Sequence, residues 1–264
     1  MAAIDLRITR RRSAFVSLTA MSEGFTKQRL ERLAAIENWH FWFVGRRAMV
    51  EDLLHTHASL PGLHLDLGCG TGHMLKTMTR RGVRAVGVDM RPEGLVSTRR
   101  INPDAILVRA DATHLPFKAG SFDSVTVLDV LEHVDDDALL SEIRTILRPG
   151  GAAVLTVPAM PWLWSWRDDE AGHLRRYTRP ALAWALSRAG FEVVVMRYYQ
   201  CLLFPLVAAS RLIGRRNSRT RDLEERRIPF VNVLFSWINS FEARLGRHVA
   251  LPWGSSLVAV CARP

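Results

Sequence analysis

Cysteine and lysine are both scarce in this chain of 264 residues. The three cysteines, Cys69, Cys201 and Cys261, stand far apart, in no spacing that binds a metal ion or builds a disulfide framework. Their small number favours a reducing, cytoplasmic compartment. Of the 36 basic residues only three are lysines, so the formal net charge of +10 comes almost wholly from arginine. That charge is consistent with an acidic partner or with the codon usage of an arginine-rich genome.

The N-terminus lacks the long apolar run of a signal peptide. Arg10-Arg11-Arg12 precedes an apolar segment, residues 14–20, that is short and carries two hydroxyl side chains. Met21 then opens a stretch that reads better as a protein start. We therefore predict that residues 1–20 are disordered or belong to an over-called start.

The dinucleotide-binding fingerprint G-x-G-x-x-G is incomplete in the most glycine-dense turn. Gly68 and Gly70 match it, but His73 stands where the third glycine belongs. The turn follows the apolar run 63–67 and precedes helical spacing, which predicts a strand, a tight loop and a helix that present backbone N–H groups to a ligand. Asp66 ends the strand, where a carboxylate repels a pyrophosphate but suits a ligand with an ammonium group and a sulfonium.

Two further predicted strands also lead into acids. Residues 84–89 form an apolar strand that ends in Asp89, about twenty residues beyond the glycines, where Rossmann-like units place a carboxylate against ribose hydroxyls. Met90 follows, either against an adenine face or in packing. Residues 105–110 run into Asp111, which is placed to accept a hydrogen bond from an adenine amino group. Strands and helices alternate in this region, which predicts a parallel sheet with helices on both faces.

Residues 60 to about 157 resemble the core of the class I S-adenosylmethionine-dependent methyltransferases. The matching phrases are L-D-L-G-C-G-T-G-H, V-G-V-D, D-A-T-H-L-P-F, the F-D strand with L-E-H-V, and R-P-G-G. The resemblance implies an α/β fold: a Rossmann-like, doubly wound, mostly parallel sheet of seven strands with an antiparallel last strand. It also implies S-adenosyl-L-methionine as the cofactor. The cofactor residues that we expect are Asp66, Gly68, Cys69, Gly70, Asp89, Met90, Asp111, Ala112 and Asp129.

Three segments surround the predicted core. Residues 21–58 form an N-terminal helical segment whose aromatic cluster, 39–43, packs on the core or covers the ligand as a lid, two roles that are compatible. Residues 59–264 form the methyltransferase domain, and within it 158–178 leave the fifth strand as a substrate lid rich in tryptophan and ionisable residues. Residues 200–252 form a helical insert before the last strand.

The insert combines apolar and basic stretches. Its first apolar run, residues 201–209, is too short to cross a bilayer. Residues 201–227 are suited to the surface of a membrane, to a homodimer interface or to packing on the domain, and these alternatives stay open. A second amphipathic segment is expected to present one apolar stripe: Val231, Leu234, Phe235, Ile238, Phe241 and Leu245. We expect a cytoplasmic protein, with contact at the inner face of the membrane as an alternative.

Three side chains are candidates to take a proton from an acceptor hydroxyl: His133, His173 and, more weakly, Tyr177. A metal offers another way to activate the acceptor. Asp129, Glu132 and His133 resemble the cluster with which ubiquinone-pathway O-methyltransferases bind a divalent ion, although a shorter Asp replaces the first acid. Helix capping explains the spacing of the two acids equally well, and we assign no metal ligand.

The predicted function is methyl transfer to a small-molecule or lipid-linked acceptor. The tryptophans of 158–178 and the insert favour O-methylation of an aromatic, polyketide-like, prenylated or glycolipid substrate. A nucleic-acid methyltransferase is the alternative that the charge suggests, but the phrase N/D-P-P-Y/F/W is missing after the fourth strand. A catalytically inactive scaffold that binds S-adenosylmethionine is the non-enzymatic alternative, and no cofactor residue is visibly eroded.

Overall fold

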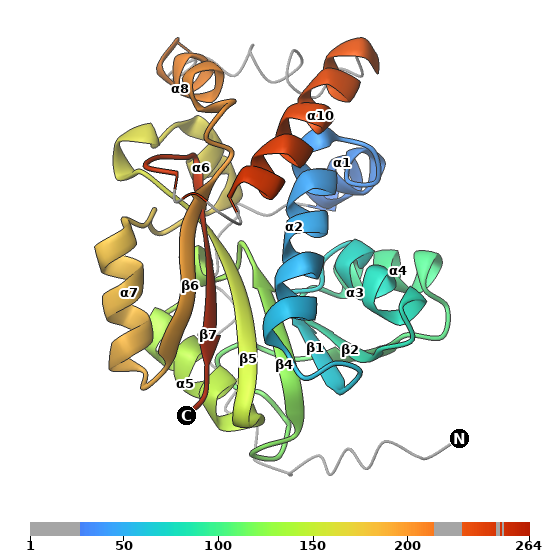
Figure 1. Ribbon diagram of the computed structural model, residues 1–264. Helices are drawn as coiled ribbons and strands as arrows, with labels where there is room; N and C mark the ends of the chain where they lie inside the picture. The colour runs from blue at the N-terminus through green and yellow to red at the C-terminus, as the bar shows by residue number, and fades with distance from the viewer. Residues whose placement is uncertain (1–26, 214–228, 247–248, 250) are drawn as a thin grey trace.

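The computed structural model describes residues 27–213, 229–246, 249 and 251–264. The prediction that residues 1–20 are disordered lies outside this part of the chain. The N-terminal helical segment is present from α1 (Lys27–Ile36) onward and continues into α2 (Phe41–His57). Helix α1 lies beyond the carboxyl ends of the strands of a central sheet, and α2 lies on the front face of that sheet (Figure 1).

Seven strands form that sheet in the order β3-β2-β1-β4-β5-β7-β6. The first five pair in parallel, and β7 runs antiparallel to both of its neighbours, β5 and β6. The predicted fold class is therefore confirmed. The strands are β1 Leu63–Leu67, β2 Arg84–Asp89, β3 Ile106–Arg109, β4 Phe122–Leu128, β5 Leu147–Pro158, β6 Glu192–Tyr199 and β7 Ser256–Ala262.

Helices cover both faces of the sheet because its buried strands carry apolar side chains on both sides. Along β5, Val154 packs into a core with α2 and α3, and the next residue, Leu155, packs into the opposite core with α5 and α7. This alternation follows from the two-residue period of a strand. The helices between the strands are α3 His73–Arg80, α4 Pro92–Ile101, α5 Asp136–Ile146, α6 Trp166–Ala171 and α7 Arg179–Arg188.

Two elements begin inside or directly before stretches noted in the sequence, the aromatic cluster and the R-P-G-G phrase. Helix α2 begins at Phe41, within the aromatic cluster, because His40 caps it: the His40 Nδ1 accepts a hydrogen bond from the Trp42 N–H at 3.3 Å. Strand β5 begins at Leu147 and includes the expected R-P-G-G turn. There Gly150 has a positive φ of 76°, and the register shifts against β4.

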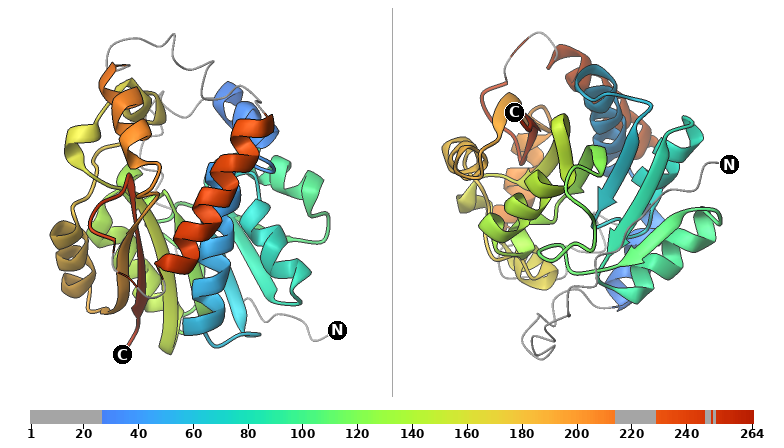
Figure 2. Two further views of the ribbon diagram at one scale, coloured as in Figure 1. Left: turned by 45° about the horizontal axis from the view of Figure 1, so that its top comes forward. Right: turned by 90° about the horizontal axis from the view of Figure 1, so that it is seen from below.

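The insert supplies two helices between β6 and β7, α8 (Phe204–Ile213) and α10 (Pro229–Leu245). They stand at the carboxyl end of the parallel strands, and α10 runs along α2 (Figures 1 and 2). Of the expected apolar stripe of α10, Leu234 and Phe241 are exposed, and the other four side chains are partly buried. Within the described residues, no helix combines the length and the apolar character that crossing a bilayer requires.

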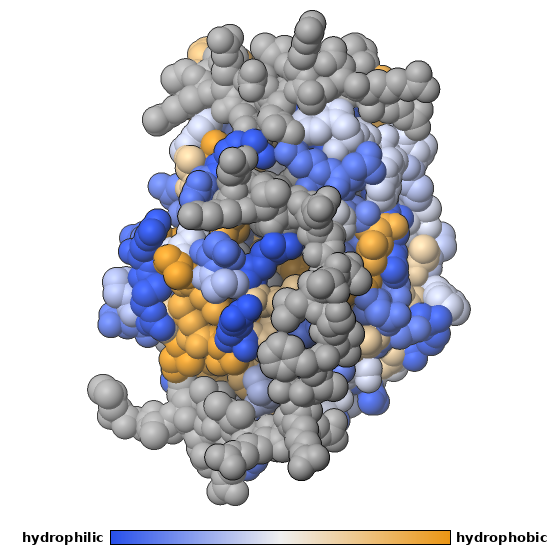
Figure 3. Space-filling model, turned by 180° about the vertical axis from the view of Figure 1, so that it is seen from behind, coloured by the Kyte–Doolittle hydropathy of each residue, from blue (hydrophilic) through white to orange (hydrophobic). Residues whose placement is uncertain are grey.

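Seen from behind, the molecule shows a broad hydrophobic patch and a separate smaller one, with hydrophilic residues between and around them (Figure 3). The front and the carboxyl end of the sheet, where α2, α8 and α10 gather, carry the cavity described next (Figure 2).

Candidate active site

A cavity of about 760 Å³ lies at the carboxyl ends of β1 to β4. Its floor is the loops that follow these strands, and its walls come from α1, α2, α8, α10 and residues 158–176. This size and position are typical of the ligand sites of open α/β sheets. The cavity therefore unites the predicted cofactor loops with all three of the segments that surround the core.

The glycine loop forms one end of this floor. Gly68 and Gly70 have φ values of 74° and 51°, a region that side chains disfavour. A Cβ on Gly68 would also come within 2.4 Å of the Val130 side chain. The N–H groups of Gly68 and Cys69 both donate to the Val88 carbonyl, at 2.8 and 2.9 Å, which anchors the loop to the end of β2. The sequence needs glycine here for both conformation and space.

Asp66 is buried beside this loop, and one of its two carboxylate oxygens accepts a hydrogen bond. Its Oδ1 accepts a hydrogen bond from the Thr126 hydroxyl at 2.8 Å, and its Oδ2 is buried without a partner. Burial raises the pKa of Asp66 from 3.8 to about 6, although the Thr126 bond opposes the shift. A buried carboxylate oxygen with no partner is a fitting receptor for an ammonium group. The residue thus has the environment that its predicted role demands.

Asp89 ties the second strand to the glycine loop. Its two carboxylate oxygens accept the Gly70 N–H at 2.9 Å and the Arg91 N–H at 2.8 Å. Burial raises the pKa of Asp89 despite these bonds. Met90 lies next to it on the cavity wall. The carboxylate is held rigidly at the position where hydroxyls of a ribose are expected.

The loop after β3 brings Asp111 and Ala112 to the same wall. The Asp111 Oδ1 accepts bonds from the Thr113 N–H at 2.9 Å and from its hydroxyl at 2.8 Å. This local turn orients the Asp111 side chain. All nine residues predicted for the cofactor line the one cavity: Asp66, Gly68, Cys69, Gly70, Asp89, Met90, Asp111, Ala112 and Asp129.

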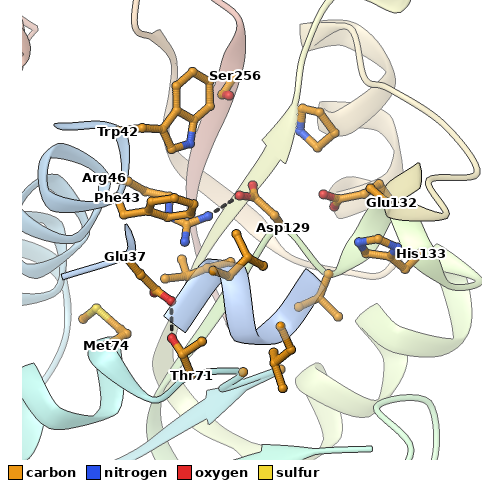
Figure 4. A pocket seen from close by; sticks show the side chains of 18 of the residues that line it. Glu37, Trp42, Phe43, Arg46, Thr71, Met74, Asp129, Glu132, His133 and Ser256 are labelled. Carbon is orange, nitrogen blue, oxygen red and sulfur yellow. Dashed lines mark hydrogen bonds and ion pairs between the residues drawn. The ribbon is translucent and has the colours of Figure 1, made fainter. Parts of the chain in front are cut away.

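Asp129 holds the N-terminal helix instead of standing open to a ligand. Its Oδ1 accepts a hydrogen bond from the Thr156 hydroxyl at 2.9 Å, and its Oδ2 forms an ion pair with Arg46 of α2 (Figure 4). Burial opposes the charge of Arg46, but Asp129 together with Tyr199, Glu37 and Glu132 outweighs it and raises the Arg46 pKa. Asp129 also adopts a positive φ of 55°. This pair spans 83 residues of sequence, and the sequence assigned Arg46 no role.

The N-terminal segment closes over the cofactor end of the cavity. Glu37 accepts a hydrogen bond from the Thr71 hydroxyl of the glycine loop, and Trp42 and Phe43 stand above it (Figure 4). The whole aromatic cluster, residues 39–43, lines the cavity. The lid and the packing interpretations of this cluster are therefore compatible. Sequence reasoning missed Glu37, whose only signal is its place two residues before the aromatic run.

Glu132, His133 and His173 form a polar group at the other end of the cavity. Their ligand atoms all lie within 4.8 Å of one another, and the His173 Nε2 is 3.8 Å from the Glu132 Oε1. The two imidazole rings meet edge to face at 4.9 Å. Glu132 is fully buried, and neither of its oxygens has a hydrogen-bond partner. Burial, followed by the charge of Asp129, raises the Glu132 pKa well above its ordinary value and favours the uncharged acid.

Asp129 does not belong to this group. Its carboxylate faces Arg46 and Thr156, so the cluster of Asp129, Glu132 and His133 that resembles a metal site is not assembled in the described part of the chain. His173, which is 40 residues further along the chain than His133, takes its place. The polar group was not predictable as a unit, because its members come from η1 (Leu131–His133) and from the loop after α6.

Both histidines are oriented by a second bond. The His133 Nδ1 donates to the Gly172 carbonyl at 3.2 Å, and the His173 Nδ1 lies 2.9 Å from the Asp168 Oδ1. Asp168 is fully buried and also accepts the Arg176 Nε–H at 2.7 Å. Burial alone would raise the Asp168 pKa, but His173 and Arg176 outweigh it and hold the pKa well below its usual range. An ionised Asp168 therefore fixes the proton of His173 on Nδ1 and leaves Nε2 as the acceptor.

Tyr177 and the tryptophans of residues 158–178 do not lie where the sequence analysis expected them. Tyr177 is buried away from the cavity lining, and its hydroxyl lies 3.4 Å from Asp136 and 3.5 Å from the Leu131 carbonyl. Burial and then the charge of Asp136 raise the pKa of Tyr177 above its ordinary value. Its position therefore gives no support to a role as base. The three tryptophans of the segment also stand outside the cavity lining, which takes Ala171, His173 and Arg176 instead. The tryptophans are Trp162, Trp164 and Trp166.

The family model of a methyltransferase domain matches residues 32–195, well over half of the chain. The chain belongs to this methyltransferase family. S-adenosylmethionine is the methyl donor of the family, so the predicted enzyme class and cofactor are confirmed at that level. The residues of the cavity fit the cofactor, because Asp66 has a buried unpartnered oxygen beside a loop that Gly70 leaves open.

Curated relatives match the chain over part of their length. An uncharacterized methyltransferase of Mycobacterium tuberculosis is 33% identical over 111 residues, which are 42% of this chain and 43% of that protein. A ubiquinone biosynthesis O-methyltransferase of Xanthomonas campestris is 31% identical over 153 residues, 51% of this chain and 62% of that protein. The chain thus spans about half of the length of these relatives.

A solved structure resembles the chain over most of its length. The phosphoethanolamine N-methyltransferase 2 of Haemonchus contortus, in complex with S-adenosyl-L-methionine, aligns with a TM-score of 0.60 and 16% identity. The alignment covers 92% of this chain and 58% of that one. At this identity the likeness supports the fold alone.

Proposed function

We propose that the protein transfers a methyl group from S-adenosylmethionine to a hydroxyl oxygen of an apolar acceptor. The observation that carries the proposal is the polar group of Glu132, His133 and His173, which lies in the cavity beside apolar side chains of α1, α8 and α10. The likeness to a ubiquinone biosynthesis O-methyltransferase supports transfer to oxygen. Aromatic, polyketide-like, prenylated and glycolipid alcohols all have the required combination of an apolar body and one hydroxyl.

The walls of the acceptor end favour an apolar body. They come from α1, α8 and α10, which contribute Leu33, Leu206, Val207, Val231 and Phe235. Such walls gain free energy by covering aliphatic or aromatic surface and gain nothing from a phosphate backbone. Arg176 and Arg211 also line the cavity, but both are paired with Asp168, so the apolar walls favour an apolar acceptor over the phosphates of a nucleic acid.

The bound cofactor supplies an electrophilic methyl group, and the chain must position the acceptor and receive its proton. His173 has the arrangement of a general base, because Asp168 orients the ring and leaves Nε2 facing Glu132 and the cavity. His133 lies in edge contact with it and supplies a second imidazole at the same place. Glu132 as the uncharged acid is suited to hydrogen-bond the acceptor oxygen.

Calorimetric titration with S-adenosylmethionine, followed by an assay of S-adenosylhomocysteine release, tests the proposal. We expect binding in the micromolar range and release only with a panel of hydroxylated apolar compounds, such as phenols and polyprenyl alcohols. The matching methyl ethers serve as the control, because they have the same apolar body without a hydroxyl. Absence of binding at millimolar ligand would refute the proposal and the scaffold alternative alike, whereas binding without turnover on any alcohol would favour the inactive scaffold.

Residues 201–227, the candidate for contact with a membrane or a second copy of the chain, include helix α8. Helix α8 contributes Leu206, Val207 and Arg211 to the cavity, which supports its role beside the acceptor. Residues 214–228 lie outside the described part of the chain. The described helices on either side, α8 and α10, are therefore the candidates for contact with a membrane or with a second copy of the chain.

A further inference from the structure

Helix α10 exposes large apolar side chains and buries polar ones, unlike an ordinary surface helix. Its most exposed side chains are Phe230 and Trp237, which are 78% and 76% exposed. Its most buried polar side chains are Asn239 and Glu242, which are only 7% and 5% exposed. A helix that packs on a water-soluble domain normally buries its apolar side chains and exposes its polar ones. The outer face of α10 is therefore not built to meet water.

Specific hydrogen bonds fix the helix in this orientation. The Asn232 Oδ1 accepts the Phe41 N–H at 2.8 Å, and its Nδ2 donates to the Trp39 carbonyl at 2.8 Å. The Asn239 Nδ2 donates to the Phe41 carbonyl at 3.2 Å, and Glu242 accepts the Leu202 N–H at 2.9 Å. Rotation of α10 to bury its apolar face would break all four bonds.

The apolar face is continuous along the helix. Five large side chains recur at helical spacing and are all exposed: Phe230, Val233, Leu234, Trp237 and Phe241. Two more exposed leucines, Leu206 and Leu212, belong to α8, which stands at the same end of the molecule (Figures 1 and 2). Single exposed apolar residues are ordinary, but a continuous face of this kind marks an interaction surface.

The charges around this face select the partner. Helices α8 and α10 expose no acidic side chain in their described residues, since the acid of α10, Glu242, is buried, and Arg244 is exposed. The sequence that joins the two helices, residues 214–228, has six arginines and three acids. A second copy of the chain would bring the same positive charge to the interface. An anionic lipid surface offers both an apolar layer and the opposite charge.

We propose that the outer face of α10 docks on an anionic membrane, with Phe230 and Trp237 in the interfacial layer. The role of this docking rests on the proposed function. Helices α8 and α10 also line the acceptor end of the cavity, through Leu206, Val231 and Phe235. Docking places this end of the cavity next to the bilayer. The substrate class that this arrangement serves is a hydroxylated lipid or lipid-linked acceptor, taken up from the membrane.

Co-sedimentation of the full chain with vesicles tests the docking. Vesicles of phosphatidylglycerol and phosphatidylcholine in equal parts should bind the protein, and vesicles of phosphatidylcholine alone should bind it more weakly. We expect the double variant Phe230→Ser/Trp237→Ser to reduce the partition coefficient by at least about tenfold. The matched control is Trp184→Ser, which removes a tryptophan on α7 that is 61% exposed, and it should leave binding unchanged.

Three results would overturn the docking: no pelleting of the unmodified chain at low salt, equal binding by the double variant, or an equal loss in Trp184→Ser. Light scattering after gel filtration adds a fourth. If the unmodified chain is a dimer, the double variant is a monomer and neither binds vesicles, this face is a dimer interface. Calorimetry with S-adenosylmethionine should give equal affinity for all variants and shows that they are folded. Methyl transfer without vesicle binding would refute the docking alone, and vesicle binding without methyl transfer would refute the proposed function alone.

Discussion

Replacing Asp66 with asparagine should weaken cofactor binding and stabilise the free protein. The Asn amide oxygen keeps the hydrogen bond from the Thr126 hydroxyl, which is 2.8 Å from the Asp66 Oδ1. The change removes the negative charge that faces the cavity through the unpartnered Oδ2. A hydrogen bond to a charged partner contributes about 1.5–3 kcal/mol. We therefore expect S-adenosylmethionine affinity to fall by about 10- to 100-fold.

The gain in stability follows from the raised pKa of Asp66. A pKa of about 6 in the fold, against 3.8 ordinarily, means that ionising Asp66 costs the native state about 3 kcal/mol. The amide of the variant leaves its own N–H groups buried without a partner, which costs about 1–2 kcal/mol. The net gain is about 1–2 kcal/mol at neutral pH, or a rise in melting temperature of about 3–6 °C.

The sign of the pH dependence separates this cause from general packing effects. The penalty of Asp66 is absent below pH 3.8, grows as the pH rises to about 6 and is constant above that value. The advantage of the variant should therefore be full at pH 7.5 and should shrink toward pH 4.5. Thermal melts at the two pH values, with and without S-adenosylmethionine, measure it.

A matched control for this experiment is Asp104→Asn, which neutralises an exposed acid after α4. It should change neither cofactor affinity nor the melting temperature by a measurable amount. A destabilised Asp66→Asn at pH 7.5, or a gain that does not vary with pH, would contradict the assignment of a strained buried carboxylate. Unchanged cofactor affinity would remove Asp66 from the cofactor site.

Three further predictions address the rest of the cavity. Asp89→Ala should weaken S-adenosylmethionine binding by about 10- to 100-fold in calorimetry, since it removes a charged partner of the expected ribose, and unchanged affinity would refute the ribose assignment. Asp168→Asn should lower kcat by about 10- to 1000-fold with little change in cofactor affinity, because His173 loses the negatively charged partner that fixes its proton and stabilises its charged form, whereas Asp169→Asn should retain activity. Tyr177→Phe should keep full activity and lose at most about 1 kcal/mol of stability in urea unfolding, since its hydroxyl makes only long bonds away from the cavity; a large loss of kcat would restore Tyr177 as a base.

The sequence by itself determined the cofactor end of the site. Asp66, Asp89 and Asp111 each follow or end a short apolar strand, and parallel strands bring their carboxyl ends to the same edge of a sheet. Glycines at 68 and 70 mark a loop that needs positive φ. These signals are local in the chain, so a reading of neighbouring residues was enough to place all of the predicted cofactor residues on one cavity.

Only the tertiary structure decided the acceptor end. The Arg46–Asp129 pair and the contact of Glu132 with His173 join residues that are distant in sequence, and no local pattern encodes such pairings. Helix α10 gives the same lesson, because apolar residues occur on nearly all of its sides. Periodicity could not tell which side faces the domain, and the hydrogen bonds of Asn232 and Asn239 to α2 and the residues before it made that choice.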